Sequence, residues 1–178
     1  MRDWGKLARR IRIPMGFAFA GVYLWLARPT WMSIGAGGAV AALGLGLRAW
    51  ASGHVTKAEE ITQSGPYAYT RNPLYLGSIL LGAGFALAAR SIWIAVGMAA
   101  ILLVVYIPVI RWEEAWLRTN LQGFDEYAAR VPRLLPRSTP AGAPGEFSRE
   151  RYLKHREYNA LLGAIAMIVA LVIKLRFY

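Results

Sequence analysis

The sequence predicts an all-α, polytopic integral membrane protein with about five transmembrane helices. Of its 178 residues, 56% are hydrophobic, which exceeds the roughly 45–50% of an ordinary soluble domain even when glycine is counted there. The mean hydropathy is +0.34, and the apolar residues gather into segments of 15 to 20 residues. A bilayer is crossed by about 20 such residues in a helix.

The first two expected spans lie near the N-terminus. A basic arm over residues 1–12 precedes an apolar segment over residues 13–27, which is short for a span and is followed by Arg28 and Pro29. Residues 32–47 form the second apolar segment, rich in the glycine and alanine that let membrane helices pack closely. Residues 48–70 are too polar to cross a bilayer and are expected to form a loop.

The third and fourth spans, residues 74–89 and 91–110, are predicted to form a helical hairpin. Proline is tolerated in the first turn of a helix, so the third helix is expected to begin at Pro73 with Asn72 as its N-cap. Each arm covers roughly the 30 Å of the hydrocarbon layer, which places Asn72 and Glu113 side by side at one membrane face. Pro108 is expected to kink the fourth helix just before Glu113.

The rest of the chain is a long polar segment and a last span. A helix is expected through residues 111–130 and a flexible connection over residues 138–145. Residues 159–173 are the fifth apolar segment, flanked by Lys174 and Arg176.

Charge and composition limit the classes of function. The 21 lysines and arginines fall mainly in the N-terminal arm, the loop after residue 47 and the segment after residue 110, so these parts are predicted to be cytoplasmic. The net charge of +11 flanks apolar segments and does not indicate nucleic acid as a partner. With no cysteine and two distant histidines, the sequence does not favour a metal site either.

Residues 65–76, GPYAYTRNPLYL, are the first stretch whose residues could form a functional site. A helix N-terminus beside Arg71 favours anionic or polar ligand groups, and Tyr67, Tyr69 and Tyr75 lie at the same opening. The alternative interpretation is a capped helix start whose tyrosines lie in the membrane interface.

Glu113 and Glu114 are the second chemical feature. Adjacent helical residues diverge by about 100°, so one carboxylate is expected to point between the hairpin arms. In the alternative, Glu114 pairs with Arg118 and Glu113 is solvated. Gly82 and Gly84 lie inside a span, where close helix packing is their default role.

These motifs resemble one known family. GPYAYTRNPLYLG, the EE pair with LRTNLQGFDEYAARVPRLLPR, and REYNALLG are similar to bacterial members of the isoprenylcysteine carboxyl methyltransferase family, which is related to the membrane phospholipid N-methyltransferases. The resemblance implies one membrane-embedded methyltransferase domain over residues 1–178, with core motifs over 48–137 and a C-terminal helix over 159–173. It also implies S-adenosylmethionine bound at the cytoplasmic face of the bacterial inner membrane.

The resemblance assigns roles to individual residues. The implied cofactor-binding residues are Tyr67, Arg71, Asn72, Tyr75, Gly82, Gly84 and Glu114. The implied catalytic residues are Glu113, Glu114, Arg130 and Arg133. Many family members carry histidine at the position of Asn72, and asparagine cannot titrate near neutral pH.

The expected methyl acceptor is lipophilic. A carboxylate acceptor, as in prenylcysteine, would need a cation such as Arg133 or Arg130, although Arg133 could instead contact lipid phosphate. An amine acceptor, as in a phospholipid, would need Glu113 or Glu114 as a base, and thiol S-methylation is a further option. From another class, a non-catalytic membrane scaffold or lipid-binding protein stays open. Under the enzyme reading, Glu114→Ala and Arg71→Ala should abolish cofactor binding with little loss of folded protein.

Overall fold

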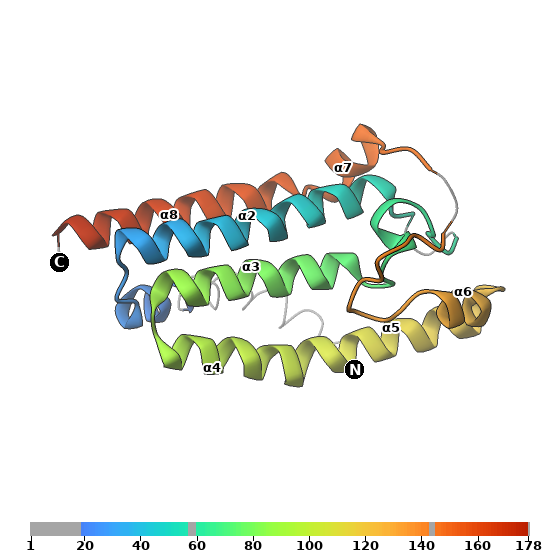
Figure 1. Ribbon diagram of the computed structural model, residues 1–178, viewed down its shortest axis with the longest axis horizontal. Helices are drawn as coiled ribbons and strands as arrows, with labels where there is room; N and C mark the ends of the chain where they lie inside the picture. The colour runs from blue at the N-terminus through green and yellow to red at the C-terminus, as the bar shows by residue number, and fades with distance from the viewer. Residues whose placement is uncertain (1–18, 57–59, 143–144, 178) are drawn as a thin grey trace, which may run out of the picture.

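The computed structural model describes residues 19–56, 60–142 and 145–177, and over these ranges the chain is helical and has no β-strand. Four long rods lie side by side (Figure 1). They are α8 (Tyr158–Phe177), α2 (Trp31–His54), α3 (Pro73–Ala89), and a continuous rod of α4 (Ile92–Ile101), the π-helical turn η2 (Leu102–Tyr106) and α5 (Ile107–Asn120). The shorter elements are a helical stretch at residues 19–26, the 3₁₀ turn η1 (Gly65–Ala68), α6 (Phe124–Arg130) and α7 (Arg149–His155). The all-α prediction is confirmed.

Three of the described helical segments are long and apolar enough to cross a membrane: Trp31–His54, Ile92–Asn120 and Tyr158–Phe177. The helix α3 is apolar but has 17 residues, or about 25 Å of length. Residues 13–18 of the first expected span lie outside the described residues. The chain is thus an integral membrane protein, and the count of five spans stays a prediction.

Exposed aromatic residues mark both ends of the three long segments. In each segment two of them lie 19 positions apart, a separation of about 28 Å along a helix, close to the roughly 30 Å of a hydrocarbon layer. The pairs are Trp31 with Trp50, Trp93 with Trp112, and Tyr158 with Phe177. Such aromatic belts lie at the two membrane interfaces. We therefore expect the residues just beyond Trp50 and Trp112 to lie at headgroup level.

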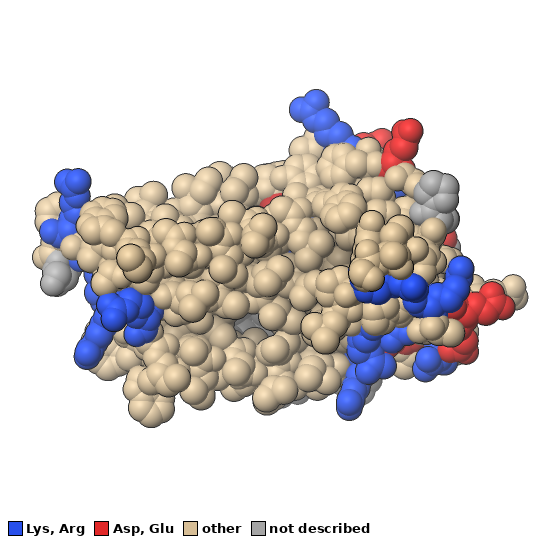
Figure 2. All heavy atoms as spheres, in the orientation of Figure 1, with Lys and Arg blue, Asp and Glu red and all other residues tan. Residues whose placement is uncertain are grey.

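The charges follow the same division into two ends. Figure 2 shows lysine and arginine at both ends of the molecule with a broad uncharged band between them, and acidic side chains gathered mainly at the end that carries α6 and α7. At the opposite end the Arg28 backbone N–H donates to the Ala89 carbonyl at 2.7 Å, and Lys174 Nζ donates to the Leu24 carbonyl. Which end faces the cytoplasm stays a prediction.

Glycines bring α2 and α3 into backbone contact. A Cβ built on Gly37 would lie 2.4 Å from the Gly84 carbonyl oxygen, and one on Gly44 would lie 2.6 Å from the Gly77 carbonyl oxygen. Both helices therefore present glycine at a spacing of seven residues to the same contact, which is the close approach expected from small residues in membrane helices.

The helix α2 is longer than predicted. The expectation of a loop from residue 48 is wrong, because the helix continues through Arg48 to His54. The Arg48 charge is neutralised by Glu157, with N–O contacts of 2.8–3.0 Å. The carbonyls at the helix end are also satisfied, since the Ser148 N–H donates to Gly53 and the Arg151 guanidinium to His54.

The polar segment is also divided differently from the prediction. The helix expected over residues 111–130 breaks after Asn120, because Gly123 has a φ of 82° and starts the separate helix α6. Residues 138–142 and 145 contain no helix, as expected for a connection. The seven-residue helix α7 was not predicted, since it carries no apolar periodicity.

The π-helical turn η2 lies just ahead of Pro108, at which a kink was expected, and the kink itself stays a prediction. The inward residues of this rod recur every four positions, at Ile94, Met98, Leu102, Tyr106, Ile110 and Glu114. A regular α-helix would rotate this row by about 40° per step, because four residues exceed one turn of 3.6. The wider turn at 102–106 takes up much of that rotation, so Tyr106 and Glu114 stay on the side facing α3.

Candidate functional site

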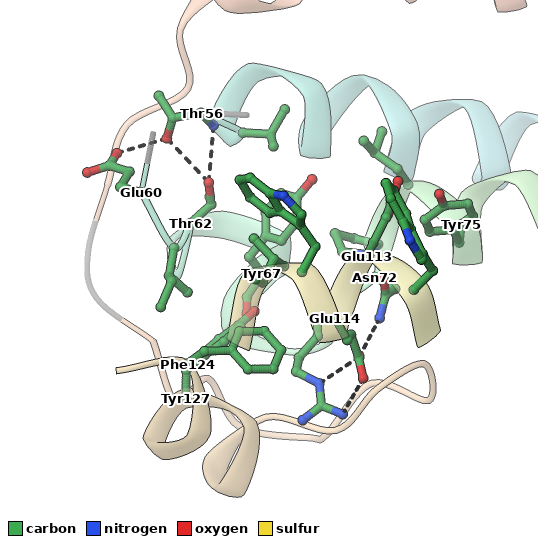
Figure 3. A pocket seen from close by; sticks show the side chains of 18 of the residues that line it. Thr56, Glu60, Thr62, Tyr67, Asn72, Tyr75, Glu113, Glu114, Phe124 and Tyr127 are labelled. Carbon is green, nitrogen blue, oxygen red and sulfur yellow. Dashed lines mark hydrogen bonds and ion pairs between the residues drawn. The ribbon is translucent and has the colours of Figure 1, made fainter. Parts of the chain in front are cut away.

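A cavity of about 520 Å³ opens where α2, α3, α5 and α6 meet, at the end of the helices that is expected at headgroup level (Figure 3). Its volume is in the usual range of small-molecule sites. The lining is mostly apolar and aromatic, with a few charged groups. It consists of Arg48, Val55, Thr56, Glu60, Ile61, Thr62, Tyr67, Arg71, Asn72, Pro73, Leu74, Tyr75, Ser78, Tyr106, Trp112, Glu113, Glu114, Trp116, Leu117, Phe124, Tyr127 and Glu157.

Glu114 is the centre of a buried ion network in one wall. Its carboxylate accepts from Arg71 Nε at 3.1 Å, from Asn72 Nδ2 at 3.1 Å and from Arg133 Nε at 2.9 Å. A second Arg71 nitrogen lies 3.4 Å from Oε2, and the Glu114 side chain is 6% exposed. Both oxygens therefore have donors, and two guanidinium groups surround the carboxylate.

The predicted hairpin is confirmed here, and the carboxylate that contacts Asn72 is that of Glu114. Asn72 and Glu114, 42 positions apart, are in hydrogen-bond contact. The alternative pairing of Glu114 with Arg118 is wrong, because Arg118 Nε contacts Asp125 at 2.6 Å. Asn72 occupies the N-cap position of α3, but its side chain does not cap the helix and instead bonds Glu114 and the Arg133 carbonyl.

Residues 132–141, which we call the strap, hold this wall from outside. The Arg71 N–H donates to the Pro132 carbonyl at 2.9 Å, and the N–H of Arg137 donates to Tyr69 at 3.1 Å. Thr70 Oγ1 donates to the Arg133 and Leu134 carbonyls at 3.2 and 3.0 Å. The strap, which follows α6 in the chain, thus binds the GPYAYTRN stretch and fixes the Arg71 backbone.

Glu113 faces the cavity beside Tyr75. Within the part of the chain that the structure describes, it makes no salt bridge, in contrast to its neighbour Glu114. The expectation that only one of the two carboxylates reaches the gap is wrong, because both line the cavity. They differ in pairing: Glu114 is bound by the wall, and Glu113 is available to a ligand.

A second ion pair, Arg48 with Glu157, lines the membrane side of the cavity. It is bidentate, with Nε–Oε2 at 3.0 Å and Nη2–Oε1 at 2.9 Å, and the two residues are 109 positions apart. Arg48 also donates to Ser78 Oγ and to the Leu74 carbonyl. The pair therefore ties α2, α3 and the start of α8 together. Our reading of the sequence missed both residues as site residues, although Glu157 belongs to the REYNALLG motif.

Tyrosines form much of the remaining wall. Tyr67 is buried, and Tyr127 Oη donates to the Tyr67 carbonyl at 2.8 Å. Burial raises the pKa of both Tyr67 and Tyr127, so both phenols stay protonated at neutral pH. The rings of Tyr75 and Tyr106 meet edge to face with centroids 5.5 Å apart. The predicted residues Tyr67, Arg71, Asn72 and Tyr75 are thus brought together around one cavity.

Other predicted residues lie elsewhere. Gly82 packs against Met98, and Gly84 against Gly37 and Ala41, so both lie at helix contacts and neither lines the cavity. Arg130 is exposed and donates to Gln63 Oε1 at 3.3 Å. Arg133 contacts Glu114 but is not among the lining residues, and its side chain is 49% exposed. Among the described residues, no group of three His, Asp or Glu side chains could hold a metal ion.

Comparison with known proteins gives a match to one protein family. Residues 39–122 match the model of the family described as phospholipid methyltransferase. This segment holds Arg71, Asn72, Glu113 and Glu114, and thus most of the network and the unpaired carboxylate.

Two bacterial relatives are similar over 92 residues. The nickel-cobalt-cadmium resistance protein NccN of Alcaligenes xylosoxydans xylosoxydans is 34% identical, and the cobalt-zinc-cadmium resistance protein CzcN of Cupriavidus metallidurans is 32% identical. Each match covers 51% of this chain and 43% of the relative, so the chain matches less than half the length of these relatives. No solved structure matches the chain significantly.

Proposed function

Because residues 39–122 match the model of the phospholipid methyltransferase family, we propose that the chain is an integral membrane methyltransferase that uses S-adenosylmethionine and acts on a lipophilic acceptor. The observation that carries the proposal is the cavity at headgroup level, with an aromatic lining and one carboxylate, Glu113, that has no cationic partner among the described residues. An acceptor held in the bilayer reaches this level without leaving the membrane.

The residues present fit the cofactor. A cavity of about 520 Å³ accommodates a small molecule, and its lining combines hydroxyl groups, aromatic rings and a free carboxylate. Tyr67, Tyr75 and Glu113 would contact the ligand, and Thr56 and Thr62 offer hydroxyls on the opposite wall. When bound, S-adenosylmethionine supplies an electrophilic methyl group on a positively charged sulfur.

Arg71, Asn72 and Glu114 act mainly through the wall that they build. Their polar groups bond one another and the strap, so they position the neighbouring lining residues. The task of such a site is to orient two reactants and exclude water. Trp112 and Trp116, on the outer side of α5, line the cavity and face the lipid side as well.

The charges at the cavity favour some acceptors over others. Both lining arginines are already paired, Arg48 with Glu157 and Arg71 with Glu114. In the described lining, a carboxylate acceptor such as prenylcysteine therefore meets no unpaired cation, and Arg133 is held by Glu114. An amine or thiol acceptor must lose a proton, and Glu113 faces the cavity to accept it. We therefore place phospholipid-type amines and thiols ahead of isoprenylcysteine-type carboxyl groups.

Calorimetric titration of S-adenosylmethionine into the detergent-purified protein tests this function. Thr62→Trp fills the cavity and should abolish binding, whereas Thr119→Trp, on the exposed face of α5, should leave binding unchanged. Labelled cofactor and membrane lipid extracts then identify the acceptor. If the folded wild type binds no cofactor, the scaffold or lipid-binding interpretation replaces ours. If Thr62→Trp binds as wild type does, the cofactor lies outside this cavity.

A further inference from the structure

The outer side of the strap carries exposed arginines around an exposed leucine. The strap begins with the sequence PRLLPR over residues 132–137 and follows Arg130, the last residue of α6. Leu135 is 78% exposed, and Arg133 and Arg137, two positions away on either side, are exposed as well. At a membrane surface an apolar side chain can enter the edge of the acyl layer while neighbouring cations stay among the headgroups.

The guanidinium groups of these arginines are mostly not neutralised. Arg137 Nη1 donates to the Arg130 carbonyl at 2.6 Å, and Arg130 Nη2 donates to Gln63 Oε1 at 3.3 Å, so both groups bind neutral oxygens. Neither arginine forms a salt bridge with any residue that the structure describes. Arg133 uses Nε for Glu114, and its side chain is still 49% exposed. Exposed guanidinium donors of this kind match phosphate oxygens.

The strap lies at the level that is expected for headgroups. The Pro132 carbonyl accepts from the Arg71 N–H at 2.9 Å, directly before the start of α3, and the strap passes this point in Figure 1. On α5, Arg133 contacts Glu114, which is two positions beyond Trp112. The ring of Trp112 is exposed and expected at the membrane interface.

We propose that the outer side of the strap, together with Arg130, is a binding site for anionic phospholipid headgroups, with Leu135 inserted at the edge of the acyl layer. A zwitterionic headgroup brings its own cation, which the arginines repel, so anionic headgroups are favoured. The inference goes beyond the proposed function, because this lipid stays bound and is not methylated. The lipid binds the outer side of a segment that holds Glu114 and Arg71, so it stabilises the cavity wall.

A fluorophore at position 135 tests the contact with lipid. The chain has no cysteine, so Leu135→Cys can be labelled alone with bimane, which is apolar like leucine. The labelled protein is placed in phosphatidylcholine nanodiscs that contain a small, equal amount of a lipid with brominated chains, either phosphatidylglycerol or phosphatidylcholine. Bromine quenches bimane on contact. We expect brominated phosphatidylglycerol to quench about fivefold more strongly, which is the contribution of roughly one basic residue at an anionic surface.

Two double variants with the same change in charge identify the arginines that are responsible. Arg130→Gln with Arg137→Gln should lower the preference for phosphatidylglycerol to less than about twofold. Arg149→Gln with Lys154→Gln removes two charges from exposed positions on α7 and should leave the preference unchanged. Equal quenching by the two lipids, quenching by neither, or full preference in the Arg130 and Arg137 variant would overturn the lipid site.

The stabilisation of the wall has its own measurement on unlabelled protein in detergent. A lipid that binds the folded state raises the melting temperature, so phosphatidylglycerol should raise it more than phosphatidylcholine does. The Arg130 and Arg137 double variant should lose this difference. Equal melting temperatures of the wild type with the two lipids would overturn the stabilisation. These experiments contain no cofactor, so their failure would leave the methyltransferase proposal intact.

Discussion

Replacing Glu114 and Glu113 separately by alanine should give opposite results, although the two residues are adjacent on one helix. Glu114→Ala removes the acceptor of three side chains, Arg71, Asn72 and Arg133. It leaves the Arg71 guanidinium, whose side chain is 12% exposed, without a counter-ion in the wall of the cavity. Glu113→Ala removes a carboxylate that forms no salt bridge among the described residues.

The expected destabilisation follows from the burial of the pair. Removing one partner of a buried ion pair costs about 3–5 kcal/mol, because the other charge stays buried. Most of this cost arises at Arg71, since Arg133 is half-exposed and solvent screens it. For a chain of this length, 1 kcal/mol moves the melting temperature by roughly 2–4 °C, so Glu114→Ala should melt about 6–20 °C lower. Glu113→Ala should stay within about 2 °C, as expected for a change of about 0.5 kcal/mol.

Thermal unfolding in one detergent at one protein concentration, followed by far-ultraviolet circular dichroism, measures both variants beside the wild type. Equal melting temperatures for the two variants would refute the assignment of Glu114 to the wall and Glu113 to the ligand. From the sequence, Glu114→Ala was expected to abolish cofactor binding with little loss of folded protein, and the buried network changes the second part of that expectation. We now expect that variant to lose both.

Three other changes test the packing and the orientation. Gly84→Leu should prevent folding or lower the melting temperature strongly, because its Cβ would lie 2.5 Å from backbone atoms of α2. Gly97→Ala is the control and should be neutral, because the space around Gly97 is open. Size-exclusion profiles and melting temperatures of both variants measure the difference. Arg48→Leu and Glu157→Leu should each destabilise the protein and the double variant should recover much of the loss, which a double-mutant cycle of melting temperatures measures. The chain has no cysteine, so a cysteine placed at Arg90 should react with an impermeant maleimide outside intact cells, and reaction only after permeabilisation would contradict the predicted topology.

The sequence was sufficient for the parts of the site that depend on helix ends. Pro73 and the lengths of two apolar segments predicted that Asn72 would lie beside Glu113, and in the structure Asn72 contacts the next residue, Glu114. Tyr67, Arg71 and Tyr75 lie at the cavity because they flank the same helix start. Helix starts have local signals in the sequence, and a hairpin converts them into a long-range contact.

Other parts of the site could not be predicted from local patterns. Which glutamate pairs with Arg71 depends on the rotation of α5, and the π-helical turn changes that rotation without a clear sequence signal. The Arg48–Glu157 pair joins positions 109 apart that share no periodic pattern. The contact of Arg133 with Glu114 was not predicted either, because it depends on how the strap folds back, and a contact of Arg133 with an acceptor or with lipid phosphate stays a prediction.

The wide sequence separation of Arg48 and Glu157 also sets an order of events during biosynthesis. A ribosome adds about 5–20 residues per second, so Glu157 is made on the order of 5–20 s after Arg48. In that interval Arg48 has no carboxylate from α8, and its long side chain can reach water and lipid phosphates at the membrane surface. The membrane side of the cavity is therefore completed only when the start of α8 reaches the bilayer. A nascent chain that already carries both glutamates of α5 would still have an unfinished binding site.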